Sequence, residues 1–164
     1  MHPPFERILT VNLICSTVIF YVAVRMYLLP RIATLKPQAI LIPILILHSF
    51  RHLGLMFLAE GATYPGMPMQ FAFPAAVGDF ITAVLAFIAI PVAAKGFQRG
   101  RTLIWAFNLV GTIDLMTAIT LATVYGASGY MGAAYWIPVF WVPALLVTHY
   151  TVFILLIRRP RVAT

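Results

Sequence analysis

The segment Ile46-Leu47-His48-Ser49-Phe50-Arg51-His52-Leu53-Gly54 lies within an apolar stretch, residues 39–58, that is long enough to cross a bilayer. Three of its side chains, His48, Arg51 and His52, stand three and four residues apart. On an α-helix this spacing predicts that all three share one face. A cation in hydrocarbon is costly and normally faces the interior of a helical bundle. We therefore expect other segments of the chain to supply partners for this face.

The composition is that of an integral membrane protein. Hydrophobic residues make up 62% of the 164 residues and charged residues only 9%, whereas soluble domains have about 45–50% and 25%. The net charge of +7 does not indicate nucleic-acid binding, because the basic residues lie at the ends of apolar segments rather than in one patch. Cys15 is the only cysteine, which excludes an internal disulfide and a thiolate metal cluster.

Five apolar segments approach or exceed the roughly 20 residues that a spanning helix needs. They are residues 8–29, 39–58, 75–94, 103–124 and 133–157. Pro138 and Pro143 predict kinks in the last segment. No repeat or linker divides the chain, so the sequence predicts an all-α bundle of five transmembrane helices in one domain, residues 1–164.

The basic residues predict the orientation of this bundle. They lie after the first, third and fifth segments, as Arg31, Lys36, Lys95, Arg99, Arg101, Arg158, Arg159 and Arg161. The other two loops, residues 59–74 and 125–132, contain no lysine or arginine. Because basic loops stay on the cytoplasmic side, we expect the N-terminus outside and the C-terminus in the cytoplasm of a bacterial-type inner membrane.

Depth estimates at about 1.5 Å per residue place acids and bases of four helices at similar levels. Because a central arginine costs roughly 2.5–3.5 kcal/mol on insertion, Arg51 is expected to pair with Asp79 or Asp114. The candidate network consists of His48, Arg51, His52, Asp79, Asp114 and His149, with Asn108 and Glu60 as secondary members. An alternative is that the ion pair only fixes the register of the helices.

The histidines allow three interpretations. His48 and His52, four residues apart, have the spacing of a helical metal site that His149 could complete. His48 or His52 could instead join His149 as axial ligands of a b-type haem. The third interpretation is that each histidine is a neutral hydrogen-bond partner of the acids and hydroxyls.

The run Arg51-His52-Leu53-Gly54-Leu55-Met56-Phe57-Leu58-Ala59-Glu60-Gly61, followed by Pro74 and Gly78-Asp79, resembles the DoxX-like membrane proteins. That family is similar in pairing an Arg-x-x-Gly-x-x-Phe helix with a following helix that opens with the pattern Gly-x-x-acid. The resemblance covers residues 51–94. It departs from the family in the acid that directly follows the glycine, in an additional first helix, and in the histidines. It implies a quinone-linked redox accessory role.

The functional hypothesis is that the network binds a small ligand or a redox partner such as a quinone or a membrane redox complex. Arg51 would hold an anionic or carbonyl group, and a histidine–aspartate couple would handle a proton. Two alternatives stay open: a haem or metal protein that uses the same histidines, and a structural subunit of a larger complex. An oligomer is compatible with the sequence, and whether the protein is an enzyme is left open.

Overall fold

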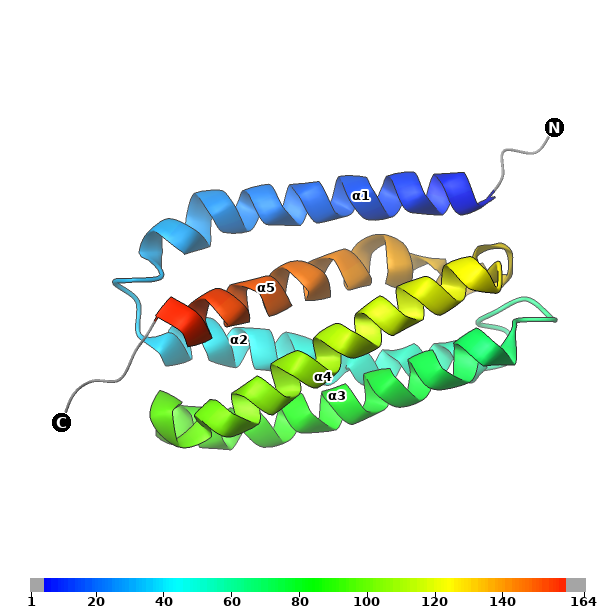
Figure 1. Cartoon of the computed structure of the whole chain (residues 1–164). Helices are drawn as coiled ribbons and strands as arrows, with labels where there is room; N and C mark the ends of the chain where they lie inside the picture. Colours follow the sequence, from blue (N-terminus) through cyan, green and yellow to red (C-terminus); the bar gives the residue numbers. More distant parts are fainter. Residues whose placement is uncertain (1–4, 159–164) are drawn as a thin grey trace.

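The computed structural model describes residues 5–158, with side chains from Arg7 onward. Arg159 and Arg161 of the predicted basic tail lie outside the described residues. Within the described range the regular structure is helical, apart from an isolated bridge between Glu60 and Thr63. The helices run back and forth along a common direction and form an up-and-down bundle (Figure 1).

The first half of the chain contains α1 (Phe5–Ala23), η1 (Val24–Leu28), η2 (Leu29–Arg31), α2 (Pro37–Ser49), η3 (Phe50–Leu58) and α3 (Met69–Lys95). The second half contains α4 (Phe97–Val124), η4 (Ala127–Tyr130), η5 (Gly132–Tyr135), η6 (Ile137–Trp141) and α5 (Val142–Arg158). Of these, η1 and η6 are π-helical and the other η segments are 3-10 helices. Within residues 5–158, five helical segments are long and apolar enough to cross a membrane, which confirms the number of predicted helices.

Two helices begin earlier than the hydropathy predicts. Helix α3 starts at Met69 rather than at residue 75 and continues through Pro74. Pro74 is the sixth residue of this helix and cannot donate the hydrogen bond that other residues would make there. The loop before α3 is correspondingly shorter than predicted. Helix α4 starts at Phe97 rather than at residue 103, because Gly96 alone joins it to α3. Gly96 has φ 149° and ψ 134°, a conformation that favours glycine.

The last predicted helix is interrupted where its prolines lie. Pro138 falls in the π-helical segment η6, and Pro143 lies in the first turn of α5. Proline cannot donate a backbone hydrogen bond, so wider or irregular turns are common where it occurs. The expected kinks therefore take the form of a π-helical turn that precedes a regular α-helix.

Helices α3 and α4 pack along each other, α2 and η3 pack on α3, and α5 packs on α4. Helix α1 instead lies along α5 and η6 (Figure 1). Its few specific contacts include a hydrogen bond from Asn12 Nδ2 to the Tyr135 hydroxyl at 3.3 Å. The rings of Phe20 and Phe140 also meet, with centroids 5.4 Å apart. The most apolar part of α1 contains no buried residue.

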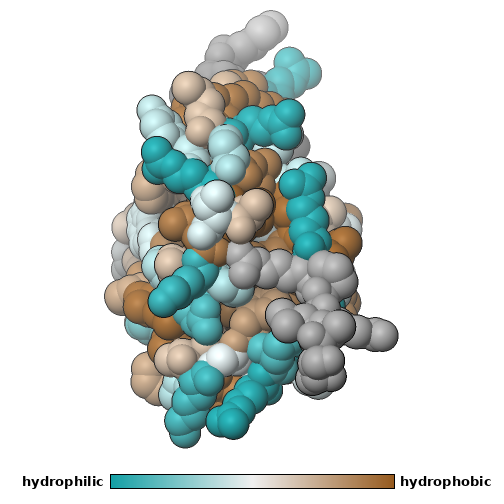
Figure 2. Space-filling model, turned by 90° about the vertical axis from the view of Figure 1, so that its left-hand side faces the viewer, coloured by the Kyte–Doolittle hydropathy of each residue, from teal (hydrophilic) through white to brown (hydrophobic). Residues whose placement is uncertain are grey.

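Most of the described basic residues gather at one end of the bundle, called the basic end here. They are Arg25, Arg31, Lys36, Lys95, Arg99, Arg101 and Arg158. Figure 2 views this end and shows hydrophilic side chains spread around apolar ones. The long faces of the bundle carry large exposed apolar residues, among them Val11, Phe80, Phe87 and Ile113.

A polar layer separates two apolar core clusters along the bundle. The cluster toward the basic end includes Leu41, Leu45, Ala89, Phe107 and Leu156. The cluster toward the opposite end includes Phe57, Phe71, Ala75, Met131 and Ile137. Between them lie the buried polar side chains His48, Arg51, Asp79, Asn108 and His149. The fold thus places the predicted acids and bases in one layer.

Candidate functional site

The helix that carries Arg51 changes from α to 3-10 geometry at Phe50. A 3-10 helix has three residues per turn, so side chains three positions apart lie above one another. Arg51, Gly54 and Phe57 are accordingly all buried. His52 is exposed, and its Nδ1–H donates to the carbonyl of Ser49 at 3.0 Å. The predicted common face therefore includes His48 and Arg51 but not His52, because the prediction assumed α-helical spacing.

Arg51 is the centre of the polar layer and is 1% exposed. Its Nε donates to Asp79 Oδ1 at 2.6 Å and its Nη2 to Asp114 Oδ2 at 2.5 Å. Its Nη1 lies 3.2 Å from both the Gly111 carbonyl and His149 Nε2. The predicted ion pair of Arg51 is thus confirmed, and it involves both carboxylates rather than one. One guanidinium thereby joins η3 to α3, α4 and α5.

Two glycines make room for the carboxylates. A Cβ added at Gly54 would collide with the Asp79 side chain, and one added at Gly78 would collide with Asp114. Each aspartate side chain is 12% exposed, whereas the Arg51 side chain is fully buried. Charge-assisted hydrogen bonds of this kind are the stronger class in proteins. Gly54 and Gly78 therefore allow the two carboxylates to approach Arg51.

The hydrogen bonds of His149 define its tautomer. A guanidinium can only donate, so His149 Nε2 accepts from Arg51 and carries no proton. Its Nδ1–H then donates to Asn108 Oδ1 at 2.8 Å. The Asn108 Nδ2 returns a hydrogen bond to the His149 carbonyl at 3.3 Å. Asn108 thus belongs to the network, and His149 is neutral.

This assignment predicts the nitrogen spectrum of His149. We expect the ¹⁵N shifts of the labelled protein to show a protonated Nδ1 and an unprotonated Nε2 at this residue. Replacing Asn108 by leucine should leave Nε2 unprotonated, since Arg51 still donates to it, but should shift the Nδ1 resonance, because Nδ1–H would lose its acceptor. A His149 ring with both nitrogens protonated in the unsubstituted protein would contradict the network.

His48 is fully buried beside the network. Its Nε2–H donates to Thr148 Oγ1 at 2.9 Å, because the Thr148 hydroxyl already donates to backbone carbonyls of α5. Its Nδ1 has no partner among the described residues. The ring lies against those of His149 and Phe107, with centroids 4.3 Å and 5.0 Å apart.

This geometry does not fit the cofactor interpretations of the histidines. The rings of His48 and His149 are in contact, which leaves no space for a porphyrin between them. Within residues 5–158 no group of three or more His, Cys, Asp or Glu side chains is placed to hold a metal ion. His52, the third expected ligand, is on the surface of the bundle.

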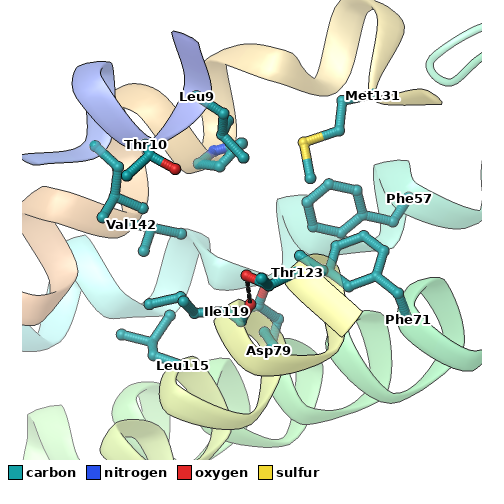
Figure 3. Close-up of a pocket in the computed structure, with 14 residues that line it drawn as sticks. Leu9, Thr10, Phe57, Phe71, Asp79, Leu115, Ile119, Thr123, Met131 and Val142 are labelled. Carbon is teal, nitrogen blue, oxygen red and sulfur yellow. Dashed lines mark hydrogen bonds between the residues drawn. The ribbon is translucent and has the colours of Figure 1, made fainter. Parts of the chain in front are cut away.

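A cavity of about 340 Å³ adjoins the polar layer on the side away from the basic end (Figure 3). Its walls come from α1, η3, α3, α4, η6, the first residue of α5 and the segment before η5. They include Leu9, Leu13, Phe57, Phe71, Leu115, Ala118, Ile119 and Met131. Thr10 and Thr123, which also line the cavity, are exposed, so the cavity has an edge near the start of α1 and the end of α4.

Asp79 is the ionisable side chain on the wall of this cavity. Its Oδ1 is bound by Arg51, while no described residue donates a hydrogen bond to its Oδ2. Thr123 points its hydroxyl back to the Ile119 carbonyl at 2.9 Å (Figure 3). The site is therefore an apolar cavity with one carboxylate, that of Asp79, in its wall. The hydrogen bond from Arg51 fixes the position of this carboxylate. Glu60 lies apart from it, exposed in the loop after η3.

The sequence did not indicate this chamber. Most of its lining residues are leucine, phenylalanine, alanine and isoleucine. These residues are common in every membrane helix, so they do not distinguish a cavity wall in a sequence. Only Asp79 carried a signal, as a costly carboxylate within an apolar segment.

The chain belongs to a protein family described as a domain of unknown function (DUF8737), whose sequence model matches residues 8–157. No curated protein and no solved structure matches the chain. The resemblance to DoxX-like proteins stays a prediction.

Proposed function

We propose that this family member spans a bacterial-type inner membrane five times, with the basic end in the cytoplasm. The support is the distribution of charge: Arg31, Lys36, Lys95 and Arg99 lie in or beside the two connections at the basic end. The loop between η3 and α3 contains no lysine or arginine. Basic residues near helix ends are retained on the cytoplasmic side during insertion.

The orientation is testable because Cys15 is the only cysteine. In a Cys15→Ser background, Tyr64→Cys should react with a membrane-impermeant maleimide on intact spheroplasts. Lys36→Cys should react only after permeabilisation, since it lies at the basic end. Both parent residues are exposed, so accessibility to the reagent depends on the side of the membrane alone. The reverse pattern would contradict the proposed orientation.

We further propose that the protein binds one small, mainly apolar molecule from the bilayer in the cavity beside Asp79. The observation that carries this proposal is a chamber of about 340 Å³ with apolar walls and one anchored carboxylate. Ligand sites are typically cavities of about 300–1,000 Å³ that combine apolar walls with few polar groups. The exposed edge at Thr10 and Thr123, near the end of the bundle opposite the basic end, gives such a molecule a path into the cavity.

In this proposal Arg51 does not hold the ligand. Its side chain has no accessible surface and donates to four groups of the protein. Its role is to fix Asp79 at the cavity wall, and Asp79 Oδ2 meets the polar end of the ligand. A redox partner such as a quinone is the second candidate, because a quinol hydroxyl could donate to Asp79 Oδ2.

This proposal is tested by a substitution that fills the cavity. Ala118→Leu places a larger apolar side chain in the cavity wall and replaces no residue of the polar layer, while Ala106→Leu makes the same change on an exposed position of α4. At least one of two probes, 4-phenylbutanol or a short-chain quinol, should raise the thermal midpoint of the purified protein, because ligands stabilise the state that they bind. Ala106→Leu should keep this increase and Ala118→Leu should lose it. An increase that survives Ala118→Leu would exclude the cavity.

A further inference from the structure

We propose that the ligand of the cavity is a lipophilic cation, of the class of primary amines with an apolar body, whose ammonium group pairs with Asp79. This inference rests on the proposed function, since it names the chemical class that the same cavity takes. Three observations carry it: the charge of the polar layer, the free oxygen of Asp79 and the aromatic wall.

The charged groups of the polar layer do not balance. Arg51 contributes one positive charge against the two carboxylates of Asp79 and Asp114. His149 adds none, because it accepts a hydrogen bond from Arg51 and donates to Asn108. With both acids ionised, the group therefore has one negative charge in excess. An uncompensated charge in a low-dielectric interior is costly, so either a proton on one aspartate or a cation in the cavity neutralises it. A cation can do so only at a carboxylate that it can reach.

The geometry places this excess where a ligand can reach it. Asp79 lines the cavity and Arg51 donates to its Oδ1, while its Oδ2 lies against Gly54 and receives no hydrogen bond from a described residue. An ammonium at Oδ2 would form the short, charge-assisted hydrogen bond typical of such pairs. Asp114 does not line the cavity, so a single carboxylate meets the ligand.

The rest of the wall also favours a cation. The rings of Phe57 and Phe71 line the cavity together, with centroids 5.0 Å apart. Ring faces attract cations, more strongly when water is excluded. No lysine or arginine lines the cavity among residues 7–158, so an anion would meet the Asp79 carboxylate without a compensating charge.

The experiment compares three probes that share one apolar body and differ in the head group: 4-phenylbutylamine, 4-phenylbutanol and 4-phenylbutyrate. Binding is measured by calorimetry on the full chain in zwitterionic lipid nanodiscs, and the signal of empty nanodiscs is subtracted. The amine should bind at least tenfold more tightly than the alcohol, and the acid should bind most weakly. Asp79→Asn should remove the preference for the amine, because the carboxylate charge is gone.

Ala118→Leu separates the two proposals and does not require a change to the polar layer. If the alcohol or the acid binds as tightly as the amine, and Ala118→Leu abolishes that binding, the cavity is a ligand site but the cation proposal is overturned. If none of the probes binds, or if Ala118→Leu leaves binding unchanged, the proposed function fails as well. Selective amine binding that both Ala118→Leu and Asp79→Asn remove supports both.

Discussion

Replacing Arg51 by methionine is expected to lower the free energy of unfolding by about 3–5 kcal/mol, the usual cost of removing one partner of a buried ion pair. Methionine keeps much of the length of the side chain but leaves Asp79 and Asp114 facing each other without a cation. The Gly111 carbonyl and His149 also lose a donor. The measurement is reversible denaturation of the purified protein in mixed micelles, with low yield of folded protein as the accompanying sign.

Restoring neutrality should restore most of this stability. The triple variant Arg51→Met, Asp79→Asn, Asp114→Asn removes all three charges and keeps the shapes, and neutral replacements of buried ion pairs are often tolerated. Arg99→Met serves as the control, because Arg99 is exposed at the basic end and should change stability by less than about 0.5 kcal/mol. If the single Arg51 variant were as stable as the Arg99 variant, the polar layer would have no structural role.

Gly111→Ala is expected to have the next largest effect, a loss of about 1–3 kcal/mol from overpacking. Gly111 lies where α4 passes α3 and α5, and an added Cβ would overlap the His149 ring and the Thr82 methyl group. To fit it, two neighbouring helices must move, and the contact of His149 with Arg51 must lengthen. The same denaturation experiment measures the loss, and the spectrum of His149 should change with it.

Gly129→Ala provides the matched comparison for this substitution. Gly129 lies in η4, and an added Cβ there meets no atom within 4 Å. We expect a change of less than about 0.5 kcal/mol. Equal effects of the two substitutions would mean that close packing at Gly111 does not limit stability.

The number of helices was predictable, because it follows from the number and length of the apolar segments. Apolar segments of spanning length indicated the five helices, and the cost of a buried Arg51 indicated its pairing with an acid. Both predictions depend on properties that can be read along the sequence, namely the length of apolar segments and the presence of a charge within one of them. That Asp79 and Asp114 both reach Arg51 could not be predicted, because helix depth does not give the rotation of a helix about its axis.

Local geometry accounts for the main failure. His52 was expected beside His48 and Arg51, but the change to a 3-10 helix at Phe50 turns it outward. The spacing of Arg51, Gly54 and Phe57 by three residues is compatible with this geometry, yet it also fits one face of an α-helix. The cavity was not predictable for a different reason: its shape results from the packing of α1, η3, α3 and α4, whose lining residues are mostly ordinary apolar side chains.

The central claim is that a small lipophilic molecule occupies the cavity beside Asp79, and photo-crosslinking tests it most directly. A 4-phenylbutylamine analogue that carries a diazirine on its apolar body would be activated in nanodiscs, and the labelled positions mapped by mass spectrometry. We expect adducts at cavity positions such as Phe57, Phe71 and Ile119, and a strong loss of labelling in the Ala118→Leu variant. Labelling confined to exposed positions such as Phe87 and Ile113, unchanged by Ala118→Leu, would contradict it.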